Sequence, residues 1–449
     1  MHSPRILIAA PSSGCGKTTV TCGILTALVR RGRKVASFKC GPDYIDPMFH
    51  EKVLGIPSGT LDSFFMDEDN LKRAYIRRAK EADLTVTEGV MGYYDGMGAT
   101  ETASTYEIAS RLGMPVILVI NARGKALSAL AEIKGFMGFR RDSGICGVIF
   151  NRMSEAVFQM LKPEVEKLGI VPLGFLPDMK DIEIKSRHLG LITPDEAEDT
   201  EKKLGILADM TEKTIDLEAL TALAEQAEDI TEPCDREIKK LPKTCIALAR
   251  DEAFCFIYRD NTELLESCGA DIVYFSPLHD ERLPECAKGL ILPGGYPELY
   301  AKGLSENRSM LSSVKKAIDD GMPCLAECGG FMYLHSSIKT ADGKCYPMCG
   351  VFSENTYATG KLQRFGYVDV IAGRDSAFLR EGESIRAHEF HYYDSENCGS
   401  SCVAKKPASG RSWECMRAEG NVLCGFPHMY YPSCRIVAER FLLCSSGRK

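Results

Sequence analysis

The sequence has no apolar stretch long enough to cross a membrane, and it has a single tryptophan among 449 residues. A membrane-spanning helix needs roughly 20 consecutive apolar residues. The sequence also has no cluster of lysine and arginine, although a basic face is typical of proteins that bind nucleic acid. We therefore expect neither a membrane nor a nucleic acid as a partner.

Cysteine is abundant, with 19 in the chain, but the cysteines are scattered, and several, such as Cys245 and Cys324, stand inside apolar runs. Disulfide scaffolds are short secreted chains, whereas a thiol in an apolar run behaves as a small hydrophobic group. We therefore expect thiols in a reducing, cytoplasmic compartment. Structural zinc sites prefer tighter spacings, but two Cys-x3-Cys pairs leave a metal or iron–sulfur site as the alternative: Cys345/Cys349 and Cys398/Cys402.

The length of the chain predicts two to three domains. Negative charge is concentrated between Asp195 and Lys240, which hold 15 acidic and 6 basic residues, a net charge of −9 against −7 for the whole chain. Leucines at helical spacing in this segment indicate one or two surface helices and a linker. The expected division is a first domain over residues 1–194, an acidic helical linker over 195–241 and a second domain over 242–449.

Short β-branched runs alternate with helical patterns in the first domain, which is typical of a parallel sheet covered by helices. A helix from about Thr18 to Arg31, ended by Gly32, follows the first strand. The expected strands are Arg5–Ala10, Lys34–Lys39, Asp83–Glu88, Pro115–Asn121, Gly144–Asn151 and Ile170–Leu176.

A second series of the same kind predicts a second doubly wound α/β domain. Helices are expected near Ala253–Cys268 and Glu306–Asp320, and the stretch after Cys345 indicates mixed strands and loops. The expected strands are Cys245–Ala249, Asp271–Phe275, Gly289–Leu292 and Cys324–Ala326.

The first expected strand leads into a glycine-rich stretch and then a helix, the context that identifies a phosphate-binding loop. Backbone N–H groups and the helix dipole at such a loop favour phosphate oxygens. Lys17 would reach the terminal phosphates of ATP, and the Thr18 hydroxyl would bind Mg²⁺. The predicted ATP-binding residues are Gly14, Cys15, Gly16, Lys17, Thr18 and Thr19.

Three further acidic residues belong with this loop. Glu88 ends a strand, where a Mg²⁺ ligand or a water-holding carboxylate is expected. Asp43 and Asp46 follow another strand and would bind Mg²⁺ or orient a substrate, unless they only cap the turn beside Pro42 and Pro47. The sequence thus predicts a Mg²⁺ site formed by Thr18, Asp43 and Glu88.

Cys328 follows a short apolar strand and precedes two glycines and a helix. This arrangement is typical of a nucleophile on a sharp strand-to-helix turn, and a helix N-terminus lowers the pKa of a thiol. The N–H groups of Gly329 and of Gly295, which follows another strand, would stabilise an oxyanion. A nucleophilic cysteine needs a base, usually histidine; the residues alone leave open a choice among His388, His391 and His428.

Several motifs together resemble the cobyrinic acid a,c-diamide synthases, a family of cobalamin-pathway amidoligases, over almost the whole chain. The motifs begin with Ala10–Gly14, which has Pro11 where a general phosphate loop has glycine, and include a segment from Ser186 to Leu191. The others are Lys39–Pro47, Thr87–Gly92 with Asp95 and Gly96, Leu292–Glu298, Ala326–Gly330 and His388–Tyr392.

The resemblance implies a dethiobiotin-synthetase-like P-loop domain and a flavodoxin-like class I glutamine amidotransferase domain. It implies that Cys328 is the nucleophile activated by His428, and that Tyr44, Asp46 and Asp95 bind the tetrapyrrole substrate. Relatives usually have a second histidine where this chain has Tyr430.

The implied reaction is ATP- and glutamine-dependent amidation of the a and c carboxylates of cobyrinate by a cytoplasmic monomer or homodimer. Mg²⁺ is the implied cofactor, and ATP, glutamine and the tetrapyrrole acid are the small-molecule partners. Alternatives are the same chemistry on nickel sirohydrochlorin or hydrogenobyrinate, the later cobyric acid amidations and, from another class, a regulatory P-loop ATPase.

Overall fold

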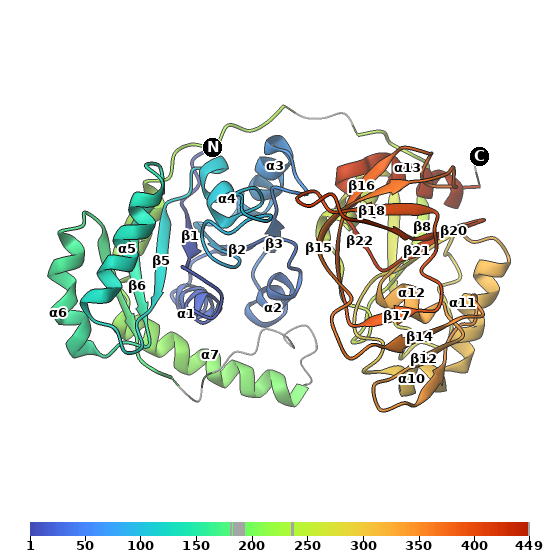
Figure 1. The fold of residues 1–449 in the computed structure, drawn as a ribbon, viewed down its shortest axis with the longest axis horizontal. Coiled ribbons are helices and arrows are strands. Elements are labelled where there is room, and N and C mark those ends of the chain that lie inside the picture. The colour runs from blue at the N-terminus through green and yellow to red at the C-terminus, as the bar shows by residue number, and fades with distance from the viewer. Residues whose placement is uncertain (180–181, 183–193, 235–237, 448–449) are drawn as a thin grey trace. The chain divides into compact units, whose positions relative to one another are not determined.

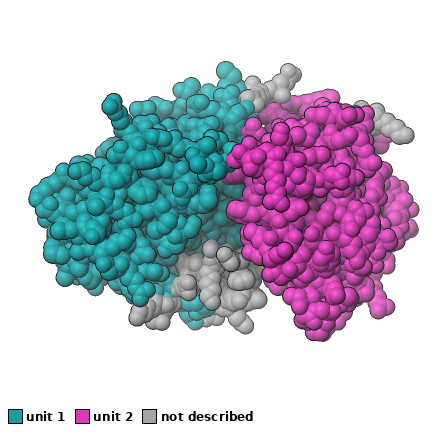
Figure 2. Space-filling view, in the orientation of Figure 1, with its two compact units in different colours: residues 1–234 teal, residues 235–449 magenta. Residues whose placement is uncertain are grey.

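The computed structural model describes residues 1–179, 182, 194–234 and 238–447. The motif from Ser186 to Leu191 lies outside the described residues. The chain forms two compact units, Met1–Cys234 and Asp235–Lys449 (Figure 2). Among the described residues, none of the helices combines the length and the apolar character that crossing a bilayer requires.

The first unit contains a seven-stranded sheet in the order β3-β2-β4-β1-β5-β6-β7 (Figure 1), in which every neighbouring pair is parallel. All residues of β1, β2 and β4 are buried, as expected for strands covered on both faces. The strands are β1 (Arg5–Ala9), β2 (Val35–Cys40), β3 (Ser58–Leu61), β4 (Leu84–Glu88), β5 (Val116–Asn121), β6 (Ile145–Asn151) and β7 (Val171–Leu176).

The strand order places functional groups at one edge of this sheet. The chain leaves β1 toward β2 on one side and reaches β5 on the other, so the order reverses at β1, and ligands of such sheets bind at the carboxyl ends of the strands at that point. The helices are α1 (Lys17–Arg30), α2 (Ile45–Leu54), α3 (Glu68–Ala79), α4 (Thr105–Arg111), α5 (Leu127–Phe139), α6 (Glu155–Glu166), α7 (Pro194–Thr214) and α8 (Leu217–Glu225).

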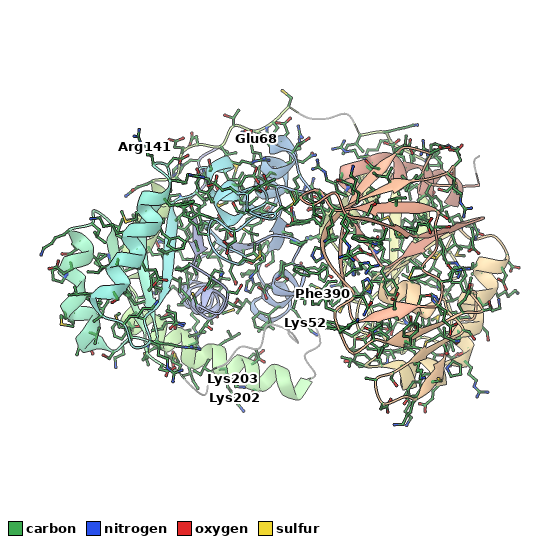
Figure 3. All side chains as sticks on the ribbon, in the orientation of Figure 1. Lys52, Glu68, Arg141, Lys202, Lys203 and Phe390 are labelled. Carbon is green, nitrogen blue, oxygen red and sulfur yellow. A yellow bond between two sulfur atoms is a disulfide. The ribbon has the colours of Figure 1, made fainter. Side chains whose placement is uncertain are left out.

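The acidic segment belongs to the first unit and does not form a separate linker. Leu204, Leu207 and Leu220 are buried in the same core as residues of α1 and β1, and Arg30 pairs with Asp209 of α7 at 2.7 Å. Other charged side chains of α7, such as Lys202, remain exposed (Figure 3). The regularly spaced leucines thus face the core of the first unit. The two units divide after Cys234.

The second unit contains a six-stranded sheet in the order β20-β21-β11-β10-β8-β9, parallel except for the β20–β21 pair. Its strands are β8 (Thr244–Ala249), β9 (Ala270–Phe275), β10 (Gly289–Leu292), β11 (Cys324–Glu327), β20 (Arg417–Glu419) and β21 (Val422–Gly425). Its helices are α9 (Arg259–Cys268), α10 (Ala301–Glu306), α11 (Arg308–Asp319), α12 (Gly329–Tyr333) and α13 (Arg435–Ser445), which follows a 3-10 turn, Tyr431–Cys434.

The stretch after Cys345 mostly forms two further sheets, in the orders β13-β12-β14-β17 and β19-β18-β15-β16-β22. Every pair in them is antiparallel except β12–β14. Their strands are β12 (Ser337–Lys339), β13 (Cys345–Pro347), β14 (Asn355–Ala358), β15 (Arg364–Ala372), β16 (Ser384–His391), β17 (Tyr393–Ser395), β18 (Cys402–Lys405), β19 (Ser412–Cys415) and β22 (His428–Met429). The prediction of parallel α/β sheets in both halves is confirmed.

Helix α9 begins six residues later than the sequence indicated. The Asp251 carboxylate accepts hydrogen bonds from the N–H groups of Ala253 and Phe254 at 2.8 and 3.0 Å, which closes a turn instead of a helix. Phe256 N–H then donates to Gly294 O at 3.0 Å. This loop therefore lies against the segment that carries Gly295.

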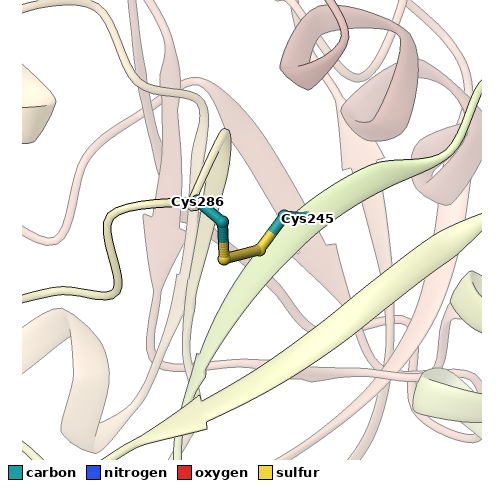
Figure 4. Close-up of a disulfide and its surroundings, with 2 residues drawn as sticks. All are labelled: Cys245 and Cys286. Carbon is teal, nitrogen blue, oxygen red and sulfur yellow. A yellow bond between two sulfur atoms is a disulfide. The ribbon is translucent and has the colours of Figure 1, made fainter.

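Cys245 and Cys286 form a disulfide that joins β8 to the loop before β10 (Figure 4). The prediction of a thiol at Cys245 is therefore wrong. The cause is a long-range contact, since Lys288 N–H donates to Cys245 O at 2.8 Å and brings the loop to the strand. No other disulfide joins cysteines of the described residues.

Candidate active sites

The phosphate-binding loop lies between β1 and α1 at the carboxyl edge of the first sheet. Gly14 and Gly16 have φ values of 78° and 98°, which only glycine adopts without strain. A Cβ on Gly16 would lie 2.0 Å from Nδ2 of Asn151, and that amide donates to Cys15 O at 2.9 Å. The two glycines thus let the loop close onto the end of β6.

A cavity of about 670 Å³ opens above this loop, within the size range of small-molecule sites. Gly14, Gly16, Lys17, Thr18 and Thr19 line it, as do the predicted metal-binding residues Asp43 and Glu88. Cys15, in contrast, does not line it. The structure thus brings most of the predicted nucleotide and metal residues to one cavity.

Lys17 reaches back over the loop. Its Nζ donates to Ser12 O at 3.1 Å and to Met91 O at 2.5 Å. Burial lowers the pKa of Lys17, and the nearby Lys39 charge adds to this effect. These carbonyls hold the ammonium group where the terminal phosphates of a nucleotide in the cavity would lie.

The residues of the predicted Mg²⁺ site fit a hard cation. Thr18 Oγ1 donates to Glu88 Oε1 at 2.6 Å, while Glu88 Oε2 is buried and has no hydrogen-bond partner among the residues that the structure describes. Hydroxyl and carboxylate oxygens are the ligands that Mg²⁺ prefers, together with water and phosphate. The described residues contain no cluster of three or more His, Cys, Asp or Glu able to hold a metal alone, so phosphate oxygens would complete this site.

Lys39 is a buried cation that the sequence did not single out. Its Nζ lies 2.6 Å from Asp46 Oδ2 and 2.6 Å from Glu88 Oε1. Burial lowers the pKa of Lys39, but the charges of Glu88 and Asp46 raise it by more, so the net shift is upward. Burial raises the pKa of Glu88 despite this partner. Lys39 therefore ties Glu88 to Asp46 beneath the nucleotide cavity.

The predicted substrate residues occupy different places. Asp46 is buried and paired with Lys39, and Tyr44 is buried immediately before α2. Asp43 Oδ1 accepts a hydrogen bond from Ile45 N–H at 2.8 Å, so this carboxylate closes the first turn of α2. Asp43 also lines the nucleotide cavity. Burial, then the Asp46 charge, raises the pKa of Asp43 to about 6. Asp95 lies outside the nucleotide cavity and lines a second pocket.

Sequence reasoning also missed four polar residues of the nucleotide cavity. Arg123, Asn151, Arg152 and Asp178 line it. Arg152 has a φ of 60°, an uncommon value for a non-glycine residue, and its Nε lies 3.8 Å from Asp178 Oδ1. Asn151 and Arg152 come from the carboxyl end of β6 and the residue after it, so strand topology, rather than a local motif, brings them here.

Cys328 occupies a sharp turn between β11 and α12 in the second unit. Its φ of 48° and ψ of −103° are strained for a non-glycine residue, and its N–H donates to Gly425 O at 2.7 Å. A Cβ on Gly330 would lie 2.0 Å from Leu292 O. Glycine at 330 thus lets α12 approach β10 and fixes the turn that presents Cys328.

The two predicted oxyanion residues lie close together. A Cβ on Gly329 would lie 3.1 Å from Gly295 N, and one on Gly295 would lie 2.0 Å from Ala253 O. A side chain at Gly329 would therefore press against Gly295, and one at Gly295 would clash with Ala253. The arrangement is suited to two N–H groups acting on one oxygen.

The thiol of Cys328 is not predisposed to ionise. Burial raises its pKa, and the negative charge of Glu298 raises it further. The sequence had predicted a lowered pKa for this thiol, because it stands at the start of a helix. Helix α12 has only five residues, and the effect of burial on the pKa outweighs the effect of the helix N-terminus. Burial also raises the pKa of Glu298 to about 7. Cys328 therefore needs a base to accept its proton.

His428 is the histidine that lies against the oxyanion segment. A Cβ on Gly294 would lie 2.2 Å from His428 Cε1. Burial, then the proximity of His391, lowers the pKa of His428 to about 3, so its imidazole is neutral near pH 7. The two rivals lie on β16: His388 is opposite His428 in the β16–β22 pair, and Nδ1 of His391 donates to Tyr393 O at 2.6 Å.

Tyr430, the position that departs from the usual motif, has a structural role. Its hydroxyl is buried and donates to Asp260 at 3.0 Å. Its ring meets that of Tyr258 edge-on at 5.8 Å. These contacts hold the segment that follows His428.

The fold and the two sites define a class: enzymes in which a nucleotide-binding α/β domain and a cysteine-dependent glutamine amidotransferase domain share one chain. Residues 6–192 match the CobQ/CobB/MinD/ParA nucleotide binding domain. Residues 245–433 match the CobB/CobQ-like glutamine amidotransferase domain.

Relatives identify the family within this class. The chain is 42% identical to a cobyrinate a,c-diamide synthase of Caldanaerobacter subterraneus subsp. tengcongensis, with 99% of each chain covered. It is 39% identical to one of Clostridium acetobutylicum, with 95% of this chain and 97% of the relative covered. The chain belongs to the cobyrinate a,c-diamide synthase family, and the predicted resemblance and enzyme class are confirmed.

Among solved structures, the MinD cell division protein of Aquifex aeolicus is 17% identical, with 52% of this chain and 100% of that chain covered and a TM-score of 0.32. A likeness at that score supports no argument about function.

Proposed function

We propose that this chain converts cobyrinate to its a,c-diamide, with ATP activating each carboxylate and glutamine supplying each nitrogen. One observation carries the proposal: a single chain holds both a phosphate-loop cavity with an unpartnered Glu88 oxygen and a Cys328 turn with paired backbone donors. A regulatory ATPase would have no use for the second site.

In the amidotransferase unit, His428 accepts the thiol proton as Cys328 Sγ attacks the amide carbon of glutamine. The N–H groups of Gly295 and Gly329 stabilise the oxyanion. The proton passes to the leaving nitrogen, so the carbon–nitrogen bond breaks to give ammonia and a thioester. Water then hydrolyses the thioester to glutamate and restores the thiol.

In the nucleotide unit, an oxygen of the substrate carboxylate attacks the terminal phosphorus of ATP, and ADP leaves. Ammonia then attacks the acyl carbon, and phosphate leaves with the former carboxylate oxygen. Lys17 balances negative charge on the transferred phosphoryl group. Thr18, Asp43 and Glu88 would hold Mg²⁺, which neutralises phosphate charge when bound.

Tyr44, Asp46 and Asp95 serve the tetrapyrrole acid in this proposal. Asp95 lies beside Lys17, whose pKa its charge raises, and it orients the substrate near the phosphoryl group. Tyr44 and Asp46 act from α2, and Asp46 does so through Lys39 as a positioning residue. Glu298 contributes negative charge beside Cys328, where the ammonium group of glutamine is a complementary ligand.

Two variants of the full chain test the proposal, with diamide formation from cobyrinate as the readout. Lys17→Ala should abolish amidation from both glutamine and ammonium, because the phosphorylated acid no longer forms. Cys328→Ala should abolish glutamine use and retain amidation from ammonium. Lys52→Ala, which removes an exposed lysine on α2 (Figure 3), and Cys345→Ala are the matched controls and should behave as the wild type.

Retained ATP-dependent amidation in Lys17→Ala, or equal loss of both nitrogen sources in Cys328→Ala, would contradict the assigned roles. No amidation of cobyrinate by the wild-type chain would contradict the proposed function itself.

A further inference from the structure

A second pocket, of about 410 Å³, lies in the first unit outside the nucleotide cavity. Tyr94, Phe136 and Phe139 form its aromatic wall, and Pro11 and Asp95 form the edge nearest the phosphate loop. The ring of Tyr94 stacks on Phe136 at 5.7 Å and contacts Phe139 at 4.9 Å. The pocket therefore offers a mainly apolar surface along the second part of α5, from Ala131 to Phe139. This helix lies beside β5 (Figure 1).

The wall of this pocket is held in place before any ligand binds. Tyr94 Oη donates to Phe136 O at 2.7 Å, and the neighbouring Tyr93 is buried, with its hydroxyl donating to Ser143 O at 2.5 Å. Phe139 nevertheless keeps 58% of its surface exposed. A large aromatic side chain in a fixed, solvent-facing wall is typical of a binding surface.

The pocket lies next to the phosphate loop. A Cβ on Gly92 would lie 2.5 Å from Pro11 O and 2.3 Å from Asp95 Oδ2, so the turn that contains Gly92 packs against the start of the phosphate loop. Met91, in the same turn, accepts the hydrogen bond from Lys17. This turn therefore contacts both Asp95 at the edge of the pocket and the ammonium group of Lys17.

The charges at the rim do not prevent an acid from entering. Glu132 is paired with Lys125 at 2.7 Å, and Asp95 accepts a hydrogen bond from Gly92 N–H at 3.0 Å and lies close enough to Lys17 to raise its pKa. The positive charge that can attract a substrate carboxylate is therefore that of Lys17, beside the turn that contains Gly92.

We propose that this pocket binds one face of the tetrapyrrole ring, so that a carboxylate arm on the ring's edge crosses the Gly92 turn and meets the nucleotide at Lys17. This inference rests on the proposed function. A flat, largely apolar ring with acid arms on its edge matches an apolar wall that ends at a phosphate site. A second copy of the chain would also cover aromatic side chains, but it would not need the wall to adjoin the reacting phosphate.

The test compares Phe139→Ala with Leu127→Ala in the full chain. Leu127 is 66% exposed, lies on the same helix twelve residues earlier, about 18 Å along its axis, and does not line the pocket. Both side chains are exposed, so neither change opens the core. Phe139→Ala should raise the KM for cobyrinate at least about tenfold, the loss expected for one phenyl contact.

The KM values for ATP and glutamine, and the glutaminase rate, should not change in Phe139→Ala. Phe139→Tyr should restore the KM for cobyrinate, and Leu127→Ala should match the wild type. An unchanged KM for cobyrinate in Phe139→Ala would overturn the assignment, and a changed sedimentation coefficient with that unchanged KM would assign the surface to a second copy. Because wild-type turnover of cobyrinate is measured alongside, failure of the proposed function is seen separately.

Discussion

Replacing Lys39 with methionine tests how the nucleotide site is held together. The side chains of Lys39, Asp46 and Glu88 are 8%, 3% and 0% exposed, so the change leaves two carboxylates buried without their shared cation. Removing one partner of a buried ion pair costs about 3–5 kcal/mol. That is a large share of the roughly 5–15 kcal/mol that stabilises a typical domain.

The control has the same geometry at the surface. Lys72 and Glu68 on α3 are also 2.6 Å apart, but their side chains are 22% and 60% exposed. Such a pair contributes about 0–1 kcal/mol. At about 2–4 °C per kcal/mol for a domain of this size, Lys39→Met should lower the melting temperature of the first unit by roughly 6–20 °C, and Lys72→Met by a few degrees at most.

The assay must report on the first unit. Trp413, the only tryptophan, lies on β19 in the second unit, so its fluorescence follows that unit alone. Calorimetry or circular dichroism, compared with Trp413 fluorescence, separates the two transitions. Lys39→Met should shift the transition that the tryptophan does not report.

The pH dependence supplies a second check. Burial already raises the pKa of Glu88, and loss of the Lys39 charge in Lys39→Met raises it further. The folded state then binds more protons than the unfolded state, so its stability falls as the pH rises above the ordinary pKa of glutamate. The penalty should therefore be smaller at pH 5 than at pH 8. Equal, small shifts for Lys39→Met and Lys72→Met, or a penalty that grows on acidification, would refute this reasoning.

Three further predictions concern both units. Gly294→Ala should abolish glutamine hydrolysis and spare amidation from ammonium, because the new methyl group would overlap His428. Gly16→Ala should abolish ATP binding in equilibrium dialysis, because its φ and its contact with Asn151 exclude a Cβ. Burial lowers the pKa of His335 to about 4. Protonation of this residue should therefore lower the free energy of unfolding of the second unit by up to about 3 kcal/mol as pH falls from 6.5 to 4, as measured by urea unfolding.

Controls separate these effects from general damage. Gly138→Ala, where a Cβ meets nothing within 4 Å, should leave glutamine hydrolysis and ATP binding intact. Normal hydrolysis in Gly294→Ala, or normal ATP affinity in Gly16→Ala, would contradict the packing arguments. His335 accepts a hydrogen bond from Ser395 at 2.7 Å when it is neutral. His335→Gln should therefore reduce the loss of unfolding free energy between pH 6.5 and 4, and an unchanged loss would refute the role of His335.

Local motifs carried the parts of the sites that sequence could predict. The loop around Lys17 and the turn at Cys328 are each set by neighbouring residues, a strand, glycines and a helix, so spacing alone located them. The positions of most parallel strands along the chain followed from hydrophobic periodicity, which is also a property of neighbouring residues.

Long-range pairing carried the parts that sequence could not predict. Lys39 faces Glu88 because β2 and β4 lie side by side with these two residues in register. His428 is distinguished from His388 and His391 by the pairing of β22 with β16, and by the contact with Gly294. No local pattern encodes either register.

Charge also misled the interpretation of the acidic segment. The segment was expected to form one or two surface helices and a linker, whereas Leu204, Leu207 and Leu220 of its two helices lie in the core of the first unit. The carboxylates lie on the other side of the same helices, and some, such as Glu218 with Arg31 at 3.0 Å, pair with α1.

The most direct test of the account traces the nitrogen. Wild-type chain, ATP and cobyrinate are incubated with amide-¹⁵N glutamine and unlabelled ammonium, and the product is analysed by mass spectrometry. The account predicts ¹⁵N in the a,c-diamide from the wild type and an unlabelled diamide from Cys328→Ala. Labelled product from Cys328→Ala, or consumption of ATP and glutamine by the wild type without amidation of cobyrinate, would contradict it.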